Sequence, residues 1–407
     1  MGSRLNRLTS RGAVVLGLGI SLAAAGVLLG VPALTRAGAL LLVLPLLARL
    51  LVSRPFGLVP SRTVDPPKVT TGTPASVHLV LRNTGRTTSP LLVAEDQVTY
   101  ALGDRPRMLV ARLSPGEERE VQYRVRSHVR GRHPVGPLSV RVTDAFGMAH
   151  REVVVPGTDS VLVLPRTVPL RGTPVMRAGS GGDESSSHQL ALHGESDVGV
   201  REYRSGDELR RIHWPSTART GQMMVRQDEQ PGRRRALVLL DNRASSHAGT
   251  GGGGSLEWSV SATASVATHL VAHGLETYLA TADEASEPLA PLGGVDDALE
   301  ALAVVATCSR PGPDGLVDAA TEVAATGGGT VVAVVGPLEH EQAQRLTRTG
   351  HGIAFVVDPD SFEQAGEQPS TTAAALTAGG WRAVDVRPGS RIAEVWDHLV
   401  AARAGVA

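Results

Sequence analysis

Two long hydrophobic runs stand near the N-terminus, at 13–31 and 38–52. The first run contains no charged residue and is about long enough to cross a bilayer. The second is shorter and carries Arg49 near its end, where a long cationic side chain can reach the membrane surface. Together they predict a transmembrane helical hairpin over residues 1–53. The small residues at 23–25 leave a cleaved signal peptide as the alternative.

Arginine residues are distributed unevenly around this hairpin. One group precedes the first run, another lies at or beyond the end of the second, and only Arg36 lies between the runs. The positive-inside rule then predicts a two-pass protein of the cell membrane, with both termini and the large C-terminal part in the cytoplasm. The flanking residues are Arg4, Arg7, Arg11, Arg49, Arg54 and Arg62.

Between residues 69 and 155, apolar and polar positions alternate in short runs rich in β-branched residues. Turn residues separate these runs every eight to twelve positions or so, a spacing typical of sandwiches. The pattern predicts a small antiparallel, immunoglobulin-like β-sandwich over residues 54–160. Arg130, Arg132 and His133 form either a docking edge of this sandwich or a charged hairpin rim.

After residue 235 the pattern changes to short apolar runs that alternate with helical spacing. The run at 236–241 is typical of a buried parallel strand. Alternating strands and helices predict a doubly wound α/β domain over 235–407. Residues 161–234 are then a separate segment, with a Gly- and Ser-rich interdomain loop at 171–193. Further strands are expected at 275–282, 330–336, 353–358 and 381–386, and helices at 256–274, 296–307, 314–326, 338–349 and 391–404.

Composition narrows the possible functions. Acidic and basic residues balance at 40 each, so no global charge favours nucleic-acid binding. The 407 residues suffice for two or three domains. The single cysteine, Cys308, excludes an intramolecular disulfide framework, which fits a reducing compartment. A nucleophilic thiol would need a histidine positioned beside it, and the sequence indicates none near Cys308.

Residues 194–229 contain most of the candidate chemistry. Their arginines cannot all be buried without partners, because an isolated buried charge is very costly. The segment is therefore either a solvated arm or an ion-pair network, and the near balance of signs favours an ordered network. The arginines are Arg201, Arg204, Arg210, Arg211, Arg219 and Arg226, and the acidic residues are Glu195, Glu202, Asp207, Glu208, Asp228 and Glu229.

The same segment contains Gly194-Glu195, Arg201-Glu202-Tyr203, Gly206-Asp207, Arg211-Ile212-His213-Trp214, Thr217-Ala218-Arg219 and Val225-Arg226. This order resembles the signature of the family called domain of unknown function 58, bacterial proteins related to von Willebrand factor A domains. Pro215, directly after the tryptophan, departs from that pattern. The resemblance implies a von Willebrand A-like, Rossmann-type α/β domain in the C-terminal region.

The resemblance also indicates where a metal site would lie. In von Willebrand A domains the first strand ends in Asp-x-Ser-x-Ser, whose oxygens bind a divalent ion. Here the corresponding residues are Asp241, Arg243 and Ser245. A guanidinium cannot ligate a metal and repels it, so we expect a degenerate site and no cofactor, Mg2+ included. Arg243 either pairs with Asp241, leaving a positive group for a partner's carboxylate, or forms a structural salt bridge, or points into solvent.

Relatives of this family are commonly encoded beside MoxR-type AAA+ ATPases and transglutaminase-like membrane proteins. The resemblance therefore implies a membrane-anchored protein-binding or scaffold module without enzymatic activity, acting as an adaptor for such an ATPase in cell-envelope or complex-assembly processes. The expected binding surface or its support comprises Arg201, Glu202, Tyr203, Gly206, Asp207, Arg211, His213, Trp214 and Arg219.

Two other function classes remain open. The first is a metal-dependent adhesion or receptor module that uses Asp241 and Ser245. The second is a hydrolase with His213 as base, oriented by Asp207 or Glu208, and with Ser196 or Ser216 as nucleophile. Residues 194–198 lack the closing glycine of a nucleophile elbow, which weakens the hydrolase hypothesis.

Overall fold

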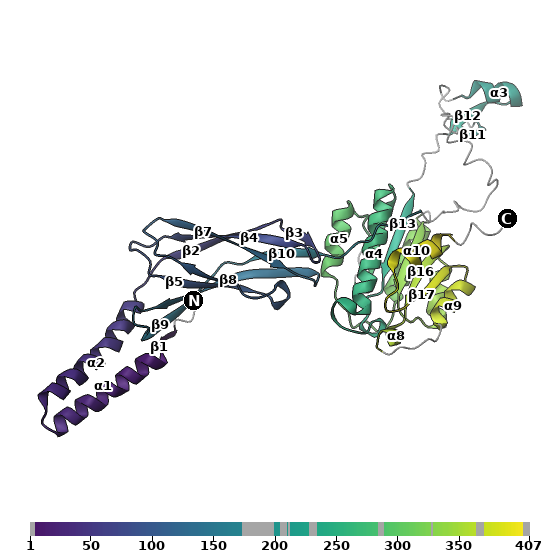
Figure 1. The fold of residues 1–407 in the computed structure, drawn as a ribbon. Helices are drawn as coiled ribbons and strands as arrows, with labels where there is room; N and C mark the ends of the chain where they lie inside the picture. Colours follow the sequence, from purple (N-terminus) through teal and green to yellow (C-terminus); the bar gives the residue numbers. More distant parts are fainter. Residues whose placement is uncertain are drawn as a thin grey trace. The chain divides into compact units, whose positions relative to one another are not determined.

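The protein has a mixed α/β architecture with two apolar N-terminal helices (Figure 1). The computed structural model describes residues 5–172, 199–203, 210, 212–227, 234–283, 289–326, 329–363 and 370–401. The chain divides into two compact units. The first comprises residues 1–167, 249–264 and 296–307, and the second comprises residues 168–248, 265–295 and 308–407.

The first unit begins with a helical hairpin, α1 (Ser10–Leu28) and α2 (Pro32–Val52). The helices pack closely through small residues: a side chain at Gly26 would overlap the backbone of Thr35, and one at Gly38 would overlap Ala23. Only 17% and 22% of their apolar windows are buried, whereas a core helix of a soluble protein is mostly buried. By length and composition, both helices could therefore span a membrane.

Two β-sheets follow the hairpin. A three-stranded sheet has the order β2-β4-β7, and a seven-stranded sheet has the order β1-β9-β8-β10-β3, with β5 pairing β8 and β6. All their pairs are antiparallel except β10 with β3. The strands are β1 (Leu5–Leu8), β2 (Leu58–Asp65), β3 (Lys68–Thr70), β4 (Pro74–Asn83), β5 (Leu92–Val98), β6 (Arg107–Val110), β7 (Glu118–Arg126), β8 (Gly131–Thr143), β9 (Ala149–Val155) and β10 (Asp159–Leu164).

The two sheets pack face to face over a shared apolar core. Alternating burial along β4 places Leu79 and Leu81 in that core, where they cluster with Leu92 and Leu138 of the larger sheet. The strand that precedes the hairpin, β1, pairs with β9 at the edge of this sheet. The alternation that predicts strands from residue 69 onward does not reveal this contribution, because β1 lies before the hydrophobic runs.

A buried ion pair also joins the two sheets. The Arg62 guanidinium on β2 donates two hydrogen bonds to the Asp96 carboxylate on β5, at 2.9 and 2.6 Å. The same carboxylate accepts a hydrogen bond from the Tyr123 hydroxyl at 2.6 Å. Burial of Tyr123, followed by this bond to Asp96, raises the pKa of its hydroxyl. The Arg62 charge is therefore paired with the Asp96 charge, and the Tyr123 hydroxyl has an acceptor in the same carboxylate.

Arg130 and His133 lie inside the first unit, at neither a docking edge nor a charged rim. Arg130 pairs with Glu257 and donates to the backbone carbonyls of Leu302 and Val305. The buried His133 ring contacts the Val129 carbonyl at 2.8 Å. Both expectations fail for these two side chains because they are buried. The acceptors that compensate the burial of Arg130 are more than 100 residues away in sequence, so spacing does not identify them.

The second unit contains a parallel sheet of order β14-β13-β15-β16-β17. Its strands are β13 (Arg235–Leu240), β14 (Glu276–Thr281), β15 (Thr330–Val335), β16 (Gly352–Val357) and β17 (Arg382–Val386), each within one residue of its predicted ends. The helices of the C-terminal region are α4 (Ser255–Ala272), α5 (Val295–Val304), α6 (Asp314–Ala325), α7 (His340–Thr347), α8 (Pro359–Glu363), α9 (Thr371–Ala378) and α10 (Ile392–Ala401). The sequence pattern does not predict α8 or α9.

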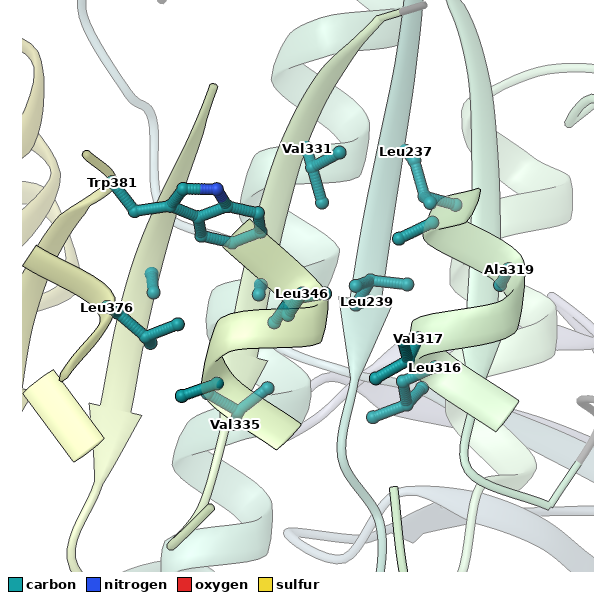
Figure 2. Packing of buried hydrophobic residues seen from close by; sticks show 14 of the residues in the cluster. Leu237, Leu239, Leu316, Val317, Ala319, Val331, Val335, Leu346, Leu376 and Trp381 are labelled. Carbon is teal, nitrogen blue, oxygen red and sulfur yellow. The ribbon is translucent and has the colours of Figure 1, made fainter. Parts of the chain in front are cut away.

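Helices cover both faces of this sheet. On one face, Leu237 and Leu239 of β13 pack with α6, while Leu346 of α7 and Trp381 complete the same core (Figure 2). On the other face, Phe355 stacks with Trp396 of α10, with ring centroids 6.5 Å apart. A strand buried on both faces reads as a continuous apolar run, which is why these strands are recognisable in the sequence.

The segment at 168–172 is fixed against the second unit. The Val168 amide donates to Ser265, and the Trp396 indole donates to the Arg171 carbonyl at 2.8 Å. The buried His269 ring contacts the Gly172 carbonyl at 2.7 Å. Residues 171 and 172, at the start of the predicted loop, form neither helix nor strand but are held by these hydrogen bonds, and the loop from residue 173 lies outside the described residues.

Candidate functional site

Strand β13 ends at the carboxyl edge of the parallel sheet, where open α/β folds bind their ligands. The next residue, Asp241, is fully buried. The Arg243 guanidinium donates to both of its carboxylate oxygens, from Nε at 2.8 Å and from a terminal nitrogen at 2.7 Å. This excludes the reading in which Arg243 points into solvent and shows the pairing with Asp241 that the other two readings share.

Other donors complete the coordination of this carboxylate. Asp241 Oδ1 also accepts the Arg243 amide at 3.2 Å, and Oδ2 accepts the Ser246 hydroxyl at 2.8 Å and the Gly336 amide at 3.1 Å. Arg243 in turn donates to the Pro337 carbonyl. Five hydrogen bonds thus converge on one carboxylate. These bonds occupy the lone pairs through which the carboxylate would bind a metal ion.

The hydroxyl at this site comes from Ser246, whereas the sequence comparison selected Ser245. A 3-10 turn at Ala244–Ser246 directs Ser246 back toward Asp241 and leaves Ser245 exposed. Among the described residues, no group of three or more His, Cys, Asp or Glu side chains could hold a metal ion. Because five donors already engage its oxygens, the Asp241 carboxylate does not fit as a ligand of a divalent ion.

The electrostatics of the pair favour its ionised form. Burial alone would raise the pKa of Asp241, but the hydrogen bonds and charge of Arg243, together with Ser246 and Gly336, lower it below its ordinary value. Burial likewise opposes the charge of Arg243, yet the Asp241 carboxylate raises the pKa of that guanidinium. Both groups therefore remain charged, and the Arg243 side chain is only 6% exposed. Little of its positive charge is available to a partner's carboxylate.

A second layer of contacts fixes the loop that carries Arg243. The Asn242 side chain donates to Asp283 at 2.8 Å and accepts from the Ala282 amide at 2.9 Å. Cys308 pairs with this loop through its backbone, donating to the Asn242 carbonyl and accepting from the Ala244 amide. The His247 ring contacts the Asp241 carbonyl at 2.6 Å. This loop is thus held at the sheet edge by hydrogen bonds from both its side chains and its backbone.

Sequence reasoning missed Ser246, Gly336 and Pro337 as members of this site. The last two follow β15, and only the parallel pairing of β13 with β15 brings them to Asp241. One signal was present in the sequence, because Gly336 stands where a larger residue would overlap Ser246. A glycine directly after a buried strand can mark such a close approach.

The signature segment forms a small β–α–β element. Strands β11 (Gly199–Glu202) and β12 (Met224–Gln227) pair antiparallel, and α3 (Trp214–Thr220) precedes β12. The Tyr203 and His213 amides donate to the carbonyls of Met223 and Met224, respectively. Ile212 and Val225 bridge opposite each other and are both buried. The resembled residues therefore specify local structure around β12.

Within this element, His213 caps α3. Its Nδ1 accepts the Ser216 amide at 3.3 Å and lies 2.8 Å from the Ser216 hydroxyl. This is the geometry of a helix N-cap, in which a side chain satisfies an otherwise unpaired amide. Pro215 fits as well, because proline is favoured in the first turn of a helix.

The element also exposes groups typical of binding surfaces. Trp214 is 67% exposed, Arg219 is exposed, and Tyr203 is half-buried. Gly206, Asp207 and Arg211, as well as the side chain of Arg201, lie outside the described residues, and so does most of the predicted ion-pair network. Among the described residues, hydrogen bonds connect Asp241 with Arg243 and His213 with Ser216, and they do not connect the two pairs.

Comparisons with known proteins place a family match over both regions. A model of the family described as protein of unknown function DUF58 matches residues 199–358. The uncharacterised protein YeaD of Bacillus subtilis (strain 168) is 28% identical over 161 residues, which cover 40% of this chain and 38% of that protein. The chain thus spans well under half the length of this curated relative.

Solved structures share only weak likeness with the chain. The CARDB domain of a Pyrococcus furiosus protein, solved in complex with di-metal ions, is 17% identical, with a TM-score of 0.20, and covers 26% of this chain and 93% of that domain. The ApaA protein of Bordetella pertussis is 14% identical, with a TM-score of 0.21, and covers 27% of this chain and 96% of its own. The similarity to DUF58 over residues 199–358, a range that includes both the signature element and the Asp241–Arg243 pair, is therefore the informative match.

Proposed function

We propose that this protein is a membrane-anchored adaptor that binds other proteins without a metal ion. In this proposal the hairpin anchors the chain with both termini in the cytoplasm. The parallel sheet is a von Willebrand A-like domain, and the partner is a MoxR-type AAA+ ATPase, with a transglutaminase-like membrane protein as a further candidate. The chain acts by binding and carries no catalytic site of its own.

The observation that carries the proposal is the closed carboxylate of Asp241. A metal-dependent binding domain needs a carboxylate that can share a cation with its ligand. Here Arg243 occupies that position with a bidentate ion pair, buried on both sides. The strand order and the place of Asp241 directly after β13 support a von Willebrand A-like fold whose ion site has been replaced by an internal salt bridge.

The signature element supports a protein partner. Tryptophan and arginine are enriched among residues that dominate binding energy at protein interfaces. Trp214 begins α3 with most of its surface exposed, and Arg219 lies in the last turn of the same helix, also exposed. An exposed aromatic side chain and a cation on the same short helix suit a partner that offers an apolar pocket and a carboxylate.

Crosslinking and pull-down from membranes test this proposal. Wild type should recover the ATPase equally well with and without a chelator of divalent ions. The Trp214→Ala/Arg219→Glu variant should lose recovery by roughly tenfold or more, the usual cost of a major interface residue. Tyr100→Ala is a matched control, because Tyr100 is an exposed aromatic residue of the sandwich. Equal recovery by wild type and the double variant would refute the assigned surface.

The metal-dependent adhesion module remains the alternative, and calorimetry separates it. Wild type titrated with Mg2+ or Mn2+ should give no heat that depends on Asp241. Micromolar binding that disappears in Asp241→Ala, while the fold is intact, would favour the alternative and remove the central argument for a metal-free adaptor.

The His213–Ser216 contact is the one observation that favours a hydrolase. A hydroxyl 2.8 Å from an imidazole nitrogen resembles a nucleophile–base pair. The same nitrogen, however, accepts the Ser216 amide, so a capping role accounts for the geometry. Loss of an ester- or amide-hydrolysing activity in both His213→Ala and Ser216→Ala, with folding unchanged, would be needed to support catalysis.

A further inference from the structure

The base of the sandwich carries a group of exposed residues with no role so far. Arg11 lies in the first turn of α1, Arg54 follows α2, and both are exposed. Phe146, at the turn between β8 and β9, is 68% exposed. We call these three residues the collar. The Arg11 guanidinium lies beside the turn, since a side chain at Gly147 would come within 3.9 Å of it.

The turn that presents Phe146 is rigid. The Asp144 carboxylate accepts the Phe146 amide at 2.9 Å and the Ala149 amide at 2.6 Å. The Gly147 amide donates to the Asp144 carbonyl. Both oxygens of the Asp144 carboxylate thus accept hydrogen bonds from the turn itself. Phe146 is therefore held outward by a preformed turn.

Both ends of the hairpin attach to this same region. At the start of α1, Thr9 donates its amide to the Met148 carbonyl and its hydroxyl to the Gly147 carbonyl. At the end of α2, the Arg151 guanidinium of β9 donates to the carbonyls of Ser53 and Arg54 at 3.1 Å each. Figure 1 shows α1 and α2 meeting the sheets next to β1 and β9. The collar therefore surrounds the point where the hairpin meets the sandwich.

The helix lengths place this point at a bilayer surface. At about 1.5 Å per residue, helices of 19 and 21 residues roughly match the 30 Å hydrocarbon core. If the helices span that core, Ser10 and the last turn of α2, which packs into the sandwich, lie at its boundary. Ala48 and Val52 also pack into the sandwich core with Leu58 and Ala149, so no flexible linker separates the sandwich from the membrane.

The charge of the collar indicates which lipid it meets. Residues 1–64 contain no Asp or Glu, and the first acidic residue of the chain is Asp65. Cationic residues at a membrane surface are attracted to anionic headgroups, and aromatic side chains insert among the adjoining acyl chains. A protein partner would have to approach through the headgroup layer to reach the same residues.

We propose that the collar binds the headgroup region of an anionic phospholipid bilayer, with Arg11 and Arg54 at the phosphates and Phe146 inserted below them. The inference rests on the proposed membrane insertion of the hairpin. In addition to the hairpin, the sandwich itself then contacts the bilayer surface. The strength of this contact depends on the lipid composition of the leaflet.

Site-specific fluorescence tests the collar in the full-length protein. Because Cys308 is the only cysteine, a Cys308→Ser background accepts a single environment-sensitive dye at Phe146→Cys. The protein is reconstituted into phosphatidylcholine vesicles, with or without phosphatidylglycerol, and quenched by brominated lipids. We expect a blue-shifted, strongly quenched dye at position 146. Tyr100→Cys is the control, since Tyr100 is 95% exposed and adjoins Leu102 of the separate Val64–Val163 core cluster.

A third probe separates failure of the collar from failure of the anchor. Val43 lies near the middle of α2 and is 55% exposed, so a dye at Val43→Cys reports insertion of the hairpin. Quenching at position 43 without quenching at position 146 overturns the collar and leaves the anchor intact. No quenching at either position overturns both.

Charge variants test the choice of lipid. Arg11→Gln/Arg54→Gln should abolish the additional quenching at position 146 caused by phosphatidylglycerol. Each lost arginine should weaken the affinity of the collar for phosphatidylglycerol roughly fivefold. Arg36→Gln changes the same charge at the other end of the hairpin and should leave the signal unchanged. Identical quenching by neutral and anionic vesicles in wild type would overturn the assignment to anionic lipid.

Discussion

Each compact unit contains a buried arginine–aspartate pair, and the two pairs differ in what they connect. In the sandwich, Arg62 and Asp96 are 34 residues apart and join strands of two different sheets. In the α/β unit, Asp241 and Arg243 are two residues apart and belong to one loop. The side chains of both pairs are at most 6% exposed, and both pairs are bidentate.

This difference shows how the same chemistry serves two purposes. Arg62 also donates to the Gly157 carbonyl, and Asp96 accepts from Tyr123, so removal of either partner affects contacts across the sandwich. Arg243 and Asp241 lie at the carboxyl edge of a parallel sheet, where a ligand would otherwise bind. The first pair therefore holds tertiary structure together, and the second fills a position that the fold makes available for binding.

The largest expected effect is that of Asp96→Ala. It leaves the Arg62 charge and the Tyr123 hydroxyl buried without their common partner, and such a loss costs about 3–5 kcal/mol of unfolding free energy. Hydrogen exchange of amides in β4 and β5 of the full chain measures it. Arg107→Ala is the control, because its side chain is 74% exposed and its pair with Glu95 should contribute little. Equal protection in the two variants would contradict a structural role for Asp96.

A double-mutant cycle on the second pair should show a smaller, more local effect. Arg243→Leu leaves the buried carboxylate with three neutral donors, the Ser246 hydroxyl, the Gly336 amide and the backbone amide of residue 243, at a cost of about 3 kcal/mol. Asp241→Ala/Arg243→Leu should cost less than the sum of the single variants, with a coupling energy of about 1–3 kcal/mol. Hydrogen exchange of amides in β13 and β15 gives the opening free energies of the wild type, the two single variants and the double variant. Additive losses would mean that the two side chains act independently.

Acid titration sharpens the comparison. The pKa of Asp241 is lower in the folded protein, so its contribution to stability is complete above the unfolded aspartate pKa of about 3.9 and is lost as pH falls through the folded value. Titration of Asp241 should therefore not change the protection of β13 amides from hydrogen exchange between pH 5 and pH 8 in the wild type. In Arg243→Leu the acid loss should begin at a higher pH, and an unchanged onset would argue against the ion pair.

The smallest expected effect is that of His269. Its burial, only partly offset by the bond to Gly172, lowers its pKa, and neighbouring His273, 4.2 Å away between ring centroids, adds to this. A lowered histidine pKa gives stability that is complete above the unfolded value of about 6.5 and is lost as pH falls. Exchange of amides in α4 and α10 should rise modestly below that pH. His269→Gln should remove this dependence, and its persistence would point to another group.

The parts of the fold that follow local periodicity were predictable from sequence. The strands of the parallel sheet appear at their expected positions because burial on both faces requires continuous apolar runs. The two apolar helices cover most of the predicted hydrophobic runs, but α2 begins six residues early, so Arg36 lies in its first turns and not between the helices. Helix α9 was missed because its Thr- and Ala-rich sequence has no apolar stripe. Strand β1 was missed because four residues before a hydrophobic helix carry no recognisable alternation.

The candidate site was predictable only where it is local. Arg243 beside Asp241 is visible in the sequence, since both follow one strand. The choice of Ser246 over Ser245 depends on a 3-10 turn, and the Gly336 amide depends on strand pairing across the sheet. The Arg62–Asp96 pair was not predicted at all, because nothing in the spacing of two charged residues indicates that their strands meet.

The pairing of β1 with β9 has a consequence for biosynthesis. Leu5 pairs with Glu152, so the first strand leaves the ribosome long before its partner exists. If the intervening helices insert into a bilayer as proposed, β1 remains unpaired at its surface until β9 has been translated. A bulky tag fused directly ahead of Leu5 should therefore slow maturation of the sandwich far more than the same tag placed after α10.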